Sequence, residues 1–600
     1  MIRFANIVLM RRTAPAACLL LVCWSACLPA MESAAERFRA LYEREWNFRL
    51  AEFPMLATEV GDHRYDNRLG SITKADIGRR ERFWRDILDE LSRIDTARLN
   101  AAEQVDATIF RRQIESFLDD IRFKMYLMPL NSDSGFHSSL AMLPFRMPLA
   151  TFDDFEHYLA RLAALPRVFA EQKAMMRRGI ELGYTVPRAI LAGRDQTFAA
   201  HVLERSDDSV FYRPFVSRPS GVDKSEWPAL QKRARAIIGE KVIPAWRDFL
   251  DFFKNEYVPA ARETIAATDL PDGKAFYANQ IRYYTTLPLD AETIHQMGLD
   301  EVARIRGEMQ RIIDDLTARD EFHGDFAAFL KFLRTDARFY AATPRELLMT
   351  ASYYAKRIDA KLPSLFGRLP RQPYGVAPVP DDIAPNYTGG RYVSAPEGGT
   401  EPGYFWVNTY DLKSRPLYVL PALTLHEAVP GHHLQIALAA EQAEQPPFRR
   451  YEYISAFGEG WGLYAEWLGV EAGIYETPYE HFGRLTYEMW RACRLVVDTG
   501  IHALGWNRTQ AIDYLLANTA LSEHEITTEV DRYIGWPAQA LSYKIGDMTI
   551  KRLRREAESA LGTRFDKRAF HDRILALGSV PLPILESAIR NFIAERQGGP

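Results

Sequence analysis

The amino-acid sequence predicts a mostly α-helical protein, with two large helical halves and a small strand element in the second half. Long segments place apolar residues three and four positions apart, which is the spacing that gives a helix one apolar face. No internal repeat at a period of about 20 to 50 residues suggests a solenoid. Proline and glycine interrupt the helical pattern near residues 213–228, 268–274 and 363–403.

Helices are expected from soon after the N-terminus onward. We expect residues 31–275 to form an N-terminal helical half and residues 276–600 to form the half that carries the chemistry. The clearest helical segments are residues 31–53, 79–94, 101–128 and 290–318.

One stretch departs from the helical pattern just ahead of the candidate site. Residues 368–403 contain proline or glycine every few positions and cannot form a regular helix. They run into "YFWVNTYD" at residues 404–411, an aromatic and β-branched stretch that predicts a strand. We expect the edge of this strand to pair with an extended peptide, with Asn408 joining the contacts.

Composition and charge exclude one class of function. The chain has 600 residues, 47% of them hydrophobic, and 75 basic residues against 79 acidic ones give a net charge of −4. A nucleic-acid-binding surface would need an excess of basic residues, so no nucleic-acid partner is expected. After the N-terminus, no apolar run approaches the roughly 20 residues of a transmembrane helix.

The N-terminus resembles an export signal. Basic residues up to Arg12 precede an apolar stretch from Ala14 to Ala26 and then small residues, the order found in secretory signals. Residues 1–30 are therefore a predicted signal peptide, cleaved after Ala30. A lipoprotein signal with Cys27 as the acylated residue is a second interpretation, and a buried N-terminal helix is a third. The first two predict a periplasmic or outer-envelope protein, tethered to a membrane only through its N-terminus.

Cysteine usage leaves one thiol in the mature chain. The other three cysteines lie in the predicted signal, and Cys493 stands alone in the apolar helical segment "MWRACRLVVDTGI". A single thiol cannot form an internal disulfide. We expect Cys493 to be a buried structural residue.

The motif "HEAVPGHH" at residues 426–433 is a variant of a zinc-peptidase helix. The usual spelling places two histidines four positions apart, with a glutamate beside the first acting as general base. Here Glu427 follows His426, but Pro430 occupies the fourth position. On an unbroken helix His433 would lie about 20° from His426 and His432 about 120° away. A bulge at the proline would instead bring His432 into place, so both histidines remain candidate ligands.

A third ligand is available downstream. Catalytic zinc takes three protein ligands and keeps one position for water. Glu459, in "SAFGEGWGLYAEWLGV", lies 27 residues after His432 and between two glycines that allow close helix approach. We expect His426, His432 and Glu459 to hold Zn²⁺. Glu466, seven residues further on, is either a partner that orients a ligand histidine or a surface carboxylate.

Five motifs in order resemble one bacterial family: "HEAVPGHHLQ", "GEGWGLYAEWL", "DTGIHALGW", "PAQALSYKIG" and "AFHDRILALGSVPLPILE". They are similar to the family catalogued as domain of unknown function 885 (DUF885), over most of the mature chain. That family is grouped with the glutamate-zincin peptidases, whose relatives include the thimet-oligopeptidase and angiotensin-converting-enzyme types. The resemblance implies a large two-lobed helical metallopeptidase-like fold. It also implies that Gly431-His432 matches the glycine-histidine step of the family's motif, which makes His432 the ligand.

An additional donor is needed for the oxyanion that forms when a peptide carbonyl is attacked. Tyr543, with Lys544 beside it, is the first candidate; a core tyrosine with a satisfied hydroxyl is the alternative. His502, after Arg494 and Asp498, is a weaker candidate, because a buried histidine that bonds Asp498 would show the same pattern.

The sequence therefore predicts an exported zinc metallopeptidase that hydrolyses short peptides, with Glu427 as general base. Two alternatives remain: a zinc-dependent amidase acting on cell-wall peptides or acylated amino acids, and an envelope binding protein that retains zinc but does not cut. The substrate, the cleavage position and the oligomeric state are left open.

Overall fold

The computed structural model describes residues 32–381, 383–395, 401–442 and 444–598. The predicted signal, with its alternatives at Cys27 and Ala30, lies outside these residues. The fold is mostly helical with one small sheet, which confirms the predicted class. No helix among the described residues is long and apolar enough to cross a membrane.

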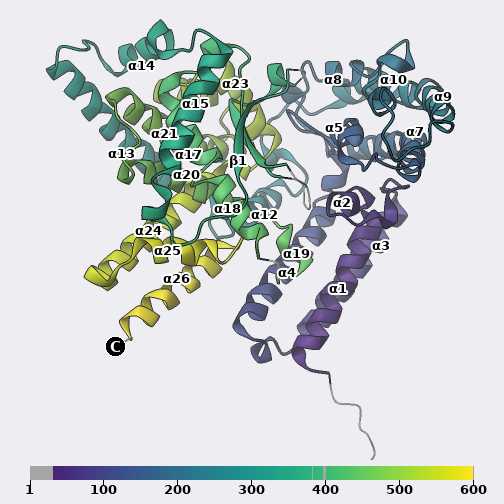
Figure 1. The fold of residues 1–600 in the computed structure, drawn as a ribbon, viewed down its shortest axis with the longest axis horizontal. Coiled ribbons are helices and arrows are strands. Elements are labelled where there is room, and N and C mark those ends of the chain that lie inside the picture. Colours follow the sequence, from purple (N-terminus) through teal and green to yellow (C-terminus); the bar gives the residue numbers. More distant parts are fainter. Residues whose placement is uncertain (1–31, 382, 396–400, 443, 599–600) are drawn as a thin grey trace, which may run out of the picture.

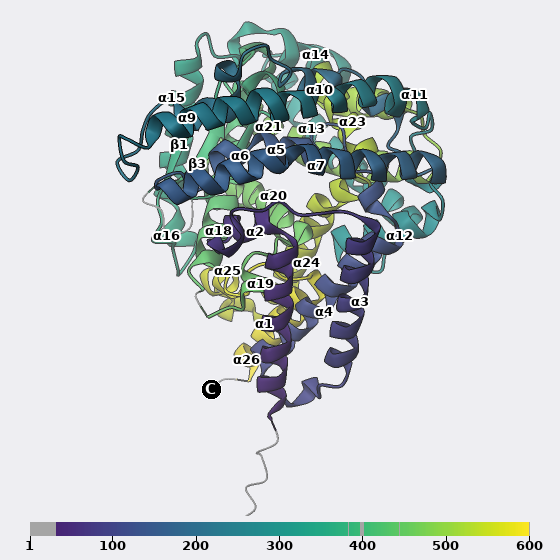
Figure 2. The same ribbon diagram turned by 90° about the vertical axis from the view of Figure 1, so that its right-hand side faces the viewer.

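The N-terminal part consists of two helical groups, which Figures 1 and 2 show from perpendicular directions. In the first group α1, α3 and α4 pack side by side and extend away from the rest of the molecule. In the second, α7 packs against α9 and α10. The bounds are α1 (Ala34–Glu52), α3 (Lys74–Ser92), α4 (Ala101–Arg122), α7 (Phe152–Leu182), α9 (Trp227–Ile237) and α10 (Ile243–Phe252).

Side-chain caps set where these helices begin. Ser33 accepts a hydrogen bond from the backbone of Glu36, whose carboxylate bonds back to the Ser33 backbone. Thr73 and Asp76 make the same reciprocal pair at the start of α3. Each pair satisfies backbone N–H groups that have no partner inside the helix.

The C-terminal part holds the candidate motif and a dense set of helices, on the left of Figure 1. In it α13 packs along α21, α20 packs along α24, and α17 contacts both α20 and α21. The longer helices are α12 (Gly273–Thr285), α13 (Ala291–Ala318), α14 (Phe326–Thr335), α15 (Pro344–Asp359), α17 (Leu420–Glu427), α18 (His432–Ala440), α20 (Ser455–Glu471), α21 (Pro478–Ala503), α22 (Arg508–Asn518), α23 (Glu523–Gly535), α24 (Ser542–Leu561), α25 (Lys567–Leu575) and α26 (Leu582–Gln597).

Two glycines let α20 and α24 approach each other closely. A Cβ atom added to Gly460 would lie 2.5 Å from the Cα of Gly546, closer than carbon atoms pack. The buried apolar side chains of both halves belong to one contiguous cluster. The packing therefore does not test the boundary near residue 275, which remains a prediction.

The sheet has three strands in the order β1-β3-β2, where β1 is Tyr374–Pro378, β2 is Gly390–Val393 and β3 is Gly403–Val407. β1 pairs with β3 in parallel, and β2 pairs with β3 in antiparallel register. The predicted strand is thus present, but it does not offer the free edge that we expected, because both its sides are paired. Asn408 is also occupied: its amide donates to the carbonyls of Ala384, Tyr387 and Thr388.

Cys493 is fully buried and has no disulfide partner among the described residues, as predicted. Burial raises the pKa of its thiol far above the usual range, so the thiol is unreactive.

Two histidines are kept in their neutral form by burial. His502 accepts from the backbone N–H of Ala267 and donates to the carbonyl of Tyr533. His571 donates to the carbonyl of Leu365, and the hydroxyl of Tyr464 lies 2.9 Å from its other nitrogen. Burial lowers the pKa of His502 to about 4 and that of His571 to about 3.

We predict that the free energy of unfolding falls as the pH drops below about 6.5. Below that pH the unfolded histidines bind protons that the folded ones exclude, at up to about 2 kcal/mol per histidine by pH 5. Urea unfolding of wild type and of His571→Gln between pH 5 and pH 7.5 checks this. The variant should be less stable at pH 7 but show a smaller pH slope, whereas the exposed His63→Gln should keep the wild-type slope. Equal slopes in all three proteins would contradict the prediction.

Candidate metal centre

The helix that carries the motif is broken rather than bulged. α17 ends at Glu427 and α18 begins at His432, so our expectation of one helix that absorbs two extra residues is wrong. Pro430, which follows a cis peptide bond, has no N–H with which to continue the helix. A Cβ atom on Gly431 would lie 1.9 Å from the carbonyl oxygen of His426, so the chain recrosses the end of α17 where only glycine fits.

Hydrogen bonds fix both ends of the turn between α17 and α18. The N–H of Gly431 donates to the carbonyl of Leu425 at 2.9 Å, and the N–H of His433 donates to that of Ala428 at 3.0 Å. From α20, the indole N–H of Trp461 donates to the carbonyl of Pro430 at 2.8 Å. The start of α18 is therefore held directly against α20, the helix that carries Glu459.

This arrangement brings His426, His432 and Glu459 together. The Oε2 atom of Glu459 lies 3.5 Å from Nε2 of His426 and 3.4 Å from Nε2 of His432. The three possible ligand atoms all lie within 4.8 Å of one another, the one such group found among the described residues. Ligands about 2.1 Å from a zinc ion at tetrahedral angles lie about 3.4 Å apart, and the two distances from Glu459 match this spacing.

His433 faces away from this group. Its Nδ1 lies 3.0 Å from the hydroxyl of Tyr392, and its Nε2 lies 3.1 Å from the carbonyl of Gln372. Burial lowers the pKa of His433 to about 4, which keeps the imidazole neutral. Both ring nitrogens are thus engaged with the sheet side of the structure, and His432 is the histidine beside Glu459.

A buried carboxylate orients His426. Glu466 is 1% exposed, so it is not the surface carboxylate that we kept as an alternative. Its Oε1 lies 2.8 Å from Nδ1 of His426 and 3.5 Å from a guanidinium nitrogen of Arg491. Nδ1 therefore donates to Glu466 and leaves Nε2 free to face Glu459. A Cβ atom on Gly462 would lie 2.6 Å from the imidazole, so the glycine makes room for the ring.

The charges around His426 oppose the effect of its burial. Burial by itself lowers the pKa of the imidazole, but hydrogen bonds to Glu459 and Glu466 outweigh it and raise the pKa to about 9. His426 and His432 in turn hold the pKa of Glu459 well below its usual range, although burial by itself would raise it. The carboxylates of Glu427, Glu459 and Glu466 therefore favour positive charge at His426, which a bound cation would supply in place of the proton.

Glu427 is held next to the trio by the sheet. Its Oε2 accepts a hydrogen bond of 2.8 Å from the backbone N–H of Tyr392 in β2. Glu427 is the last residue of α17 and is partly exposed, so the carboxylate is both positioned and reachable.

Tyr543 borders the site from α24. Its ring stacks against that of His426 with centroids 6.5 Å apart, and the guanidinium of Arg494 lies 4.3 Å from the Tyr543 ring centroid. Burial and the charge of Glu459 raise the pKa of the phenol, against the opposing effect of Arg494. The phenol therefore keeps its proton and can donate it in a hydrogen bond.

Two other residues named from the sequence serve the scaffold. His502 is buried far from bulk water between Ala267 and Tyr533, and it does not bond Asp498. Lys544 forms ion pairs of 2.8 to 2.9 Å with three acidic residues, Glu301, Glu488 and Asp547.

Sequence reasoning missed two contacts that shape the site. The hydroxyl of Tyr453 donates to Oε1 of Glu459 at 3.0 Å, and the N–H of Tyr392 holds Glu427. Tyr453 lies in the loop just before α20, where only the spacing of six residues to Glu459 could have drawn attention to it. The Tyr392 contact is made by the backbone N–H, so the type of residue at that position does not reveal it.

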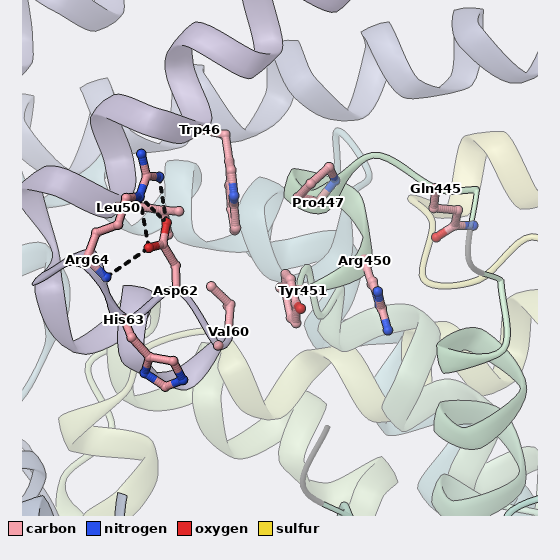
Figure 3. Close-up of a pocket in the computed structure, with 11 residues that line it drawn as sticks. Trp46, Leu50, Val60, Asp62, His63, Arg64, Gln445, Pro447, Arg450 and Tyr451 are labelled. Atoms are coloured by element: carbon pink, nitrogen blue, oxygen red, sulfur yellow. Dashed lines mark hydrogen bonds and ion pairs between the residues drawn. The ribbon is translucent and has the colours of Figure 1, made fainter. Parts of the chain in front are cut away.

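A wide cavity of about 640 Å³ lies where the two halves meet, close to this loop (Figure 3). Trp46, Asp62 and Arg64 line it from the N-terminal half, and Arg450 and Tyr451 line it from the segment before α20. Since Tyr451 is two residues from Tyr453, this cavity borders the segment that leads to Glu459.

Comparison with known proteins shows one family and two related folds. The chain is similar to the crystal structure of the putative lipoprotein from Colwellia psychrerythraea, with 28% identity, a TM-score of 0.85, and coverage of 94% of this chain and 100% of that one. A putative lipoprotein of unknown function from Shewanella oneidensis has the same coverage, 19% identity and a TM-score of 0.72, so it shows similarity of fold. No curated protein matches the chain significantly.

The family described as "Bacterial protein of unknown function (DUF885)" matches residues 54–589, which is nearly the whole chain. This agrees with the five motifs quoted above, which extend from residue 426 to residue 586. The chain belongs to the DUF885 family.

Proposed function

We propose that the protein is an exported zinc-dependent peptidase that hydrolyses short peptides. The observation that carries this proposal is the placement of His426, His432 and Glu459 at the mutual distances of zinc ligands, with Glu427 fixed beside them. A carboxylate next to the ligands is what metal-assisted hydrolysis needs and what a purely structural zinc site does not.

His426, His432 and Glu459 would hold the ion. Zinc at this place supplies an acidified water and polarises the peptide carbonyl. Glu427 takes a proton from the attacking water, whose oxygen forms the new bond to the carbonyl carbon. Glu427 then passes a proton to the amide nitrogen as the C–N bond breaks, which yields a carboxylate and an amine. Tyr543 donates a hydrogen bond to the carbonyl oxygen as negative charge develops there.

The strand β2 is the place for an extended substrate. β2 pairs with β3 on one side, and its other side faces Glu427 through the N–H of Tyr392. A peptide beside β2 would have its main chain next to the residue that moves the proton. This replaces the strand at residues 403–407 as the expected binding edge.

Two observations support a location in the cell envelope. The two similar structures are described as putative lipoproteins, and the N-terminal sequence here carries Cys27 in a signal-like context. We propose that the mature chain is anchored through that cysteine.

We predict that three alanine substitutions abolish zinc binding and that a fourth does not. His426→Ala, His432→Ala and Glu459→Ala each remove one of three ligands, so purified protein should contain far less than one zinc per chain. His433→Ala should retain the metal, because both nitrogens of His433 are bonded elsewhere. Elemental analysis with calorimetric zinc titration makes the comparison. Loss of zinc in His433→Ala with retention in His432→Ala would overturn the ligand assignment.

We predict that Glu427→Gln retains zinc and lowers turnover of short peptides by about 10² to 10⁴-fold, the contribution of a positioned general base. The matched control is Glu444→Gln, an exposed glutamate in the loop after α18. Peptide cleavage is followed by mass spectrometry, with muropeptides and acylated amino acids as parallel substrates. Zinc-loaded wild type that cleaves none of these would support a binding protein instead. Cleavage of muropeptides or acylated amino acids alone would support the amidase.

We predict that Glu466→Gln weakens zinc affinity by about 10 to 100-fold without unfolding the protein, because the amide orients His426 less strongly than the carboxylate does. Competition with a chelator of known affinity measures the change, and the thermal transition reports on folding. Unchanged affinity would show that Glu466 serves packing alone.

A further inference from the structure

A second cavity, of about 240 Å³, lies beside the candidate metal centre. It is bounded by the first turns of α17, the end of β3, the middle of α21 and the start of α23. Leu420, Leu423, Val407, Tyr487 and Ala520 contribute to its wall. None of these residues is needed to explain the metal centre.

The geometry of α17 joins this cavity to Glu427. At about 100° per residue, Leu420, Leu423 and Glu427 lie within about 60° of one another on the same face of the helix. Leu423 is one turn before Glu427, which is about 6 Å along the axis.

The strand β2 leads to the same place. A Cβ atom on Gly390, the first residue of β2, would lie 3.1 Å from Cδ2 of Leu423, and Gly389 lines the cavity itself. Two residues along the strand, Tyr392 bonds Glu427. β2 therefore runs from the residue that holds Glu427 to the wall of the cavity.

The wall is chiefly apolar, and its charges oppose each other. Leu347 and Leu521 add to the leucines of α17. The charged residues that line the cavity are Arg334, Lys413 and Arg415 of one sign and Glu523 and Glu525 of the other. Burial raises the pKa of Glu525 to about 7, and Arg415 is the largest opposing influence, so the two groups are electrostatic neighbours. An acidic side chain would meet Glu525 and a basic one would meet Arg415. A cavity of about 150 Å³ is enough for a benzene ring, so this one accommodates an aromatic side chain.

We propose that this cavity receives the side chain of a substrate residue that adjoins the cleaved bond, and that it selects a large apolar side chain. The proposal rests on the peptidase function proposed above. It adds the class of substrate: short peptides with phenylalanine, leucine or a similar residue at the cleavage position.

The test compares peptide cleavage before and after the cavity is filled. Zinc-loaded wild type is given two series of hexapeptides in which one or the other residue flanking the cleaved bond is Phe, Leu, Ala, Asp or Lys. We expect kcat/KM for Phe or Leu to exceed that for Ala by about 10 to 200-fold at one of the two positions, since each methylene in an apolar pocket adds strongly to selectivity. Asp and Lys should be poorest there.

Two variants fill the cavity from different sides. Ala520→Leu fills it from the wall and Ser414→Phe from a partly exposed position, so failure of one to fold leaves the other. Each should lower the Phe-to-Ala ratio to below about a tenth of the wild-type value while zinc content and cleavage of the Ala peptide are retained. The control Ser587→Phe, at an exposed position of α26, should keep the wild-type ratio.

The outcomes separate the two proposals. Cleavage without preference at either flanking position, or a preference that both filled variants retain, overturns the role of the cavity and leaves the peptidase function standing. Absence of cleavage for every peptide by zinc-loaded wild type overturns the peptidase function, and the role of the cavity with it.

Discussion

The turn between α17 and α18 determines which histidine reaches Glu459. If the helix continued past Glu427, the residue seven positions after His426 would return to the same face, and that residue is His433. The missing N–H of Pro430 ends the helix, and the close crossing at Gly431 restarts it at His432. The bond from Trp461 then ties the turn to the helix that carries the third candidate ligand. The candidate metal centre depends on this one interruption.

The surroundings of the trio explain why the imidazoles stay in place. His426 is fixed by Glu466, which is itself next to Arg491 in the core. An isolated buried carboxylate would be costly, and pairing with an imidazole and a guanidinium offsets that cost. On the other side, Tyr453 holds the outer oxygen of Glu459. His426 and Glu459 are thus oriented by groups from different segments.

Much of the helical architecture could be predicted from sequence, because apolar spacing and caps act locally. α1, α4 and α13 fall within segments expected from periodicity alone, and α3 begins five residues before the segment expected at 79–94. The motif spacing also pointed to His426 and Glu427, which the structure places beside Glu459 and β2 respectively. The choice between His432 and His433 could not be made from helix geometry, since it depends on a turn whose conformation involves α20. The strand order and the backbone bond from Tyr392 were beyond reach for the same reason: both depend on pairing between segments distant in sequence.

The short helix α17 brings two properties of the site into one rigid element. Its residues from Leu420 to His426 are buried, so it cannot shift without disturbing the core on every side. Its last turn presents His426 toward α20 and Glu427 toward β2, while its first turns form a wall of the neighbouring cavity. A change that moves the cavity wall therefore also moves the carboxylate beside the metal ligands. In the proposed mechanism, selection of a side chain and proton transfer would be coupled through the eight residues of this helix, so the fold rather than a mobile loop would position the substrate.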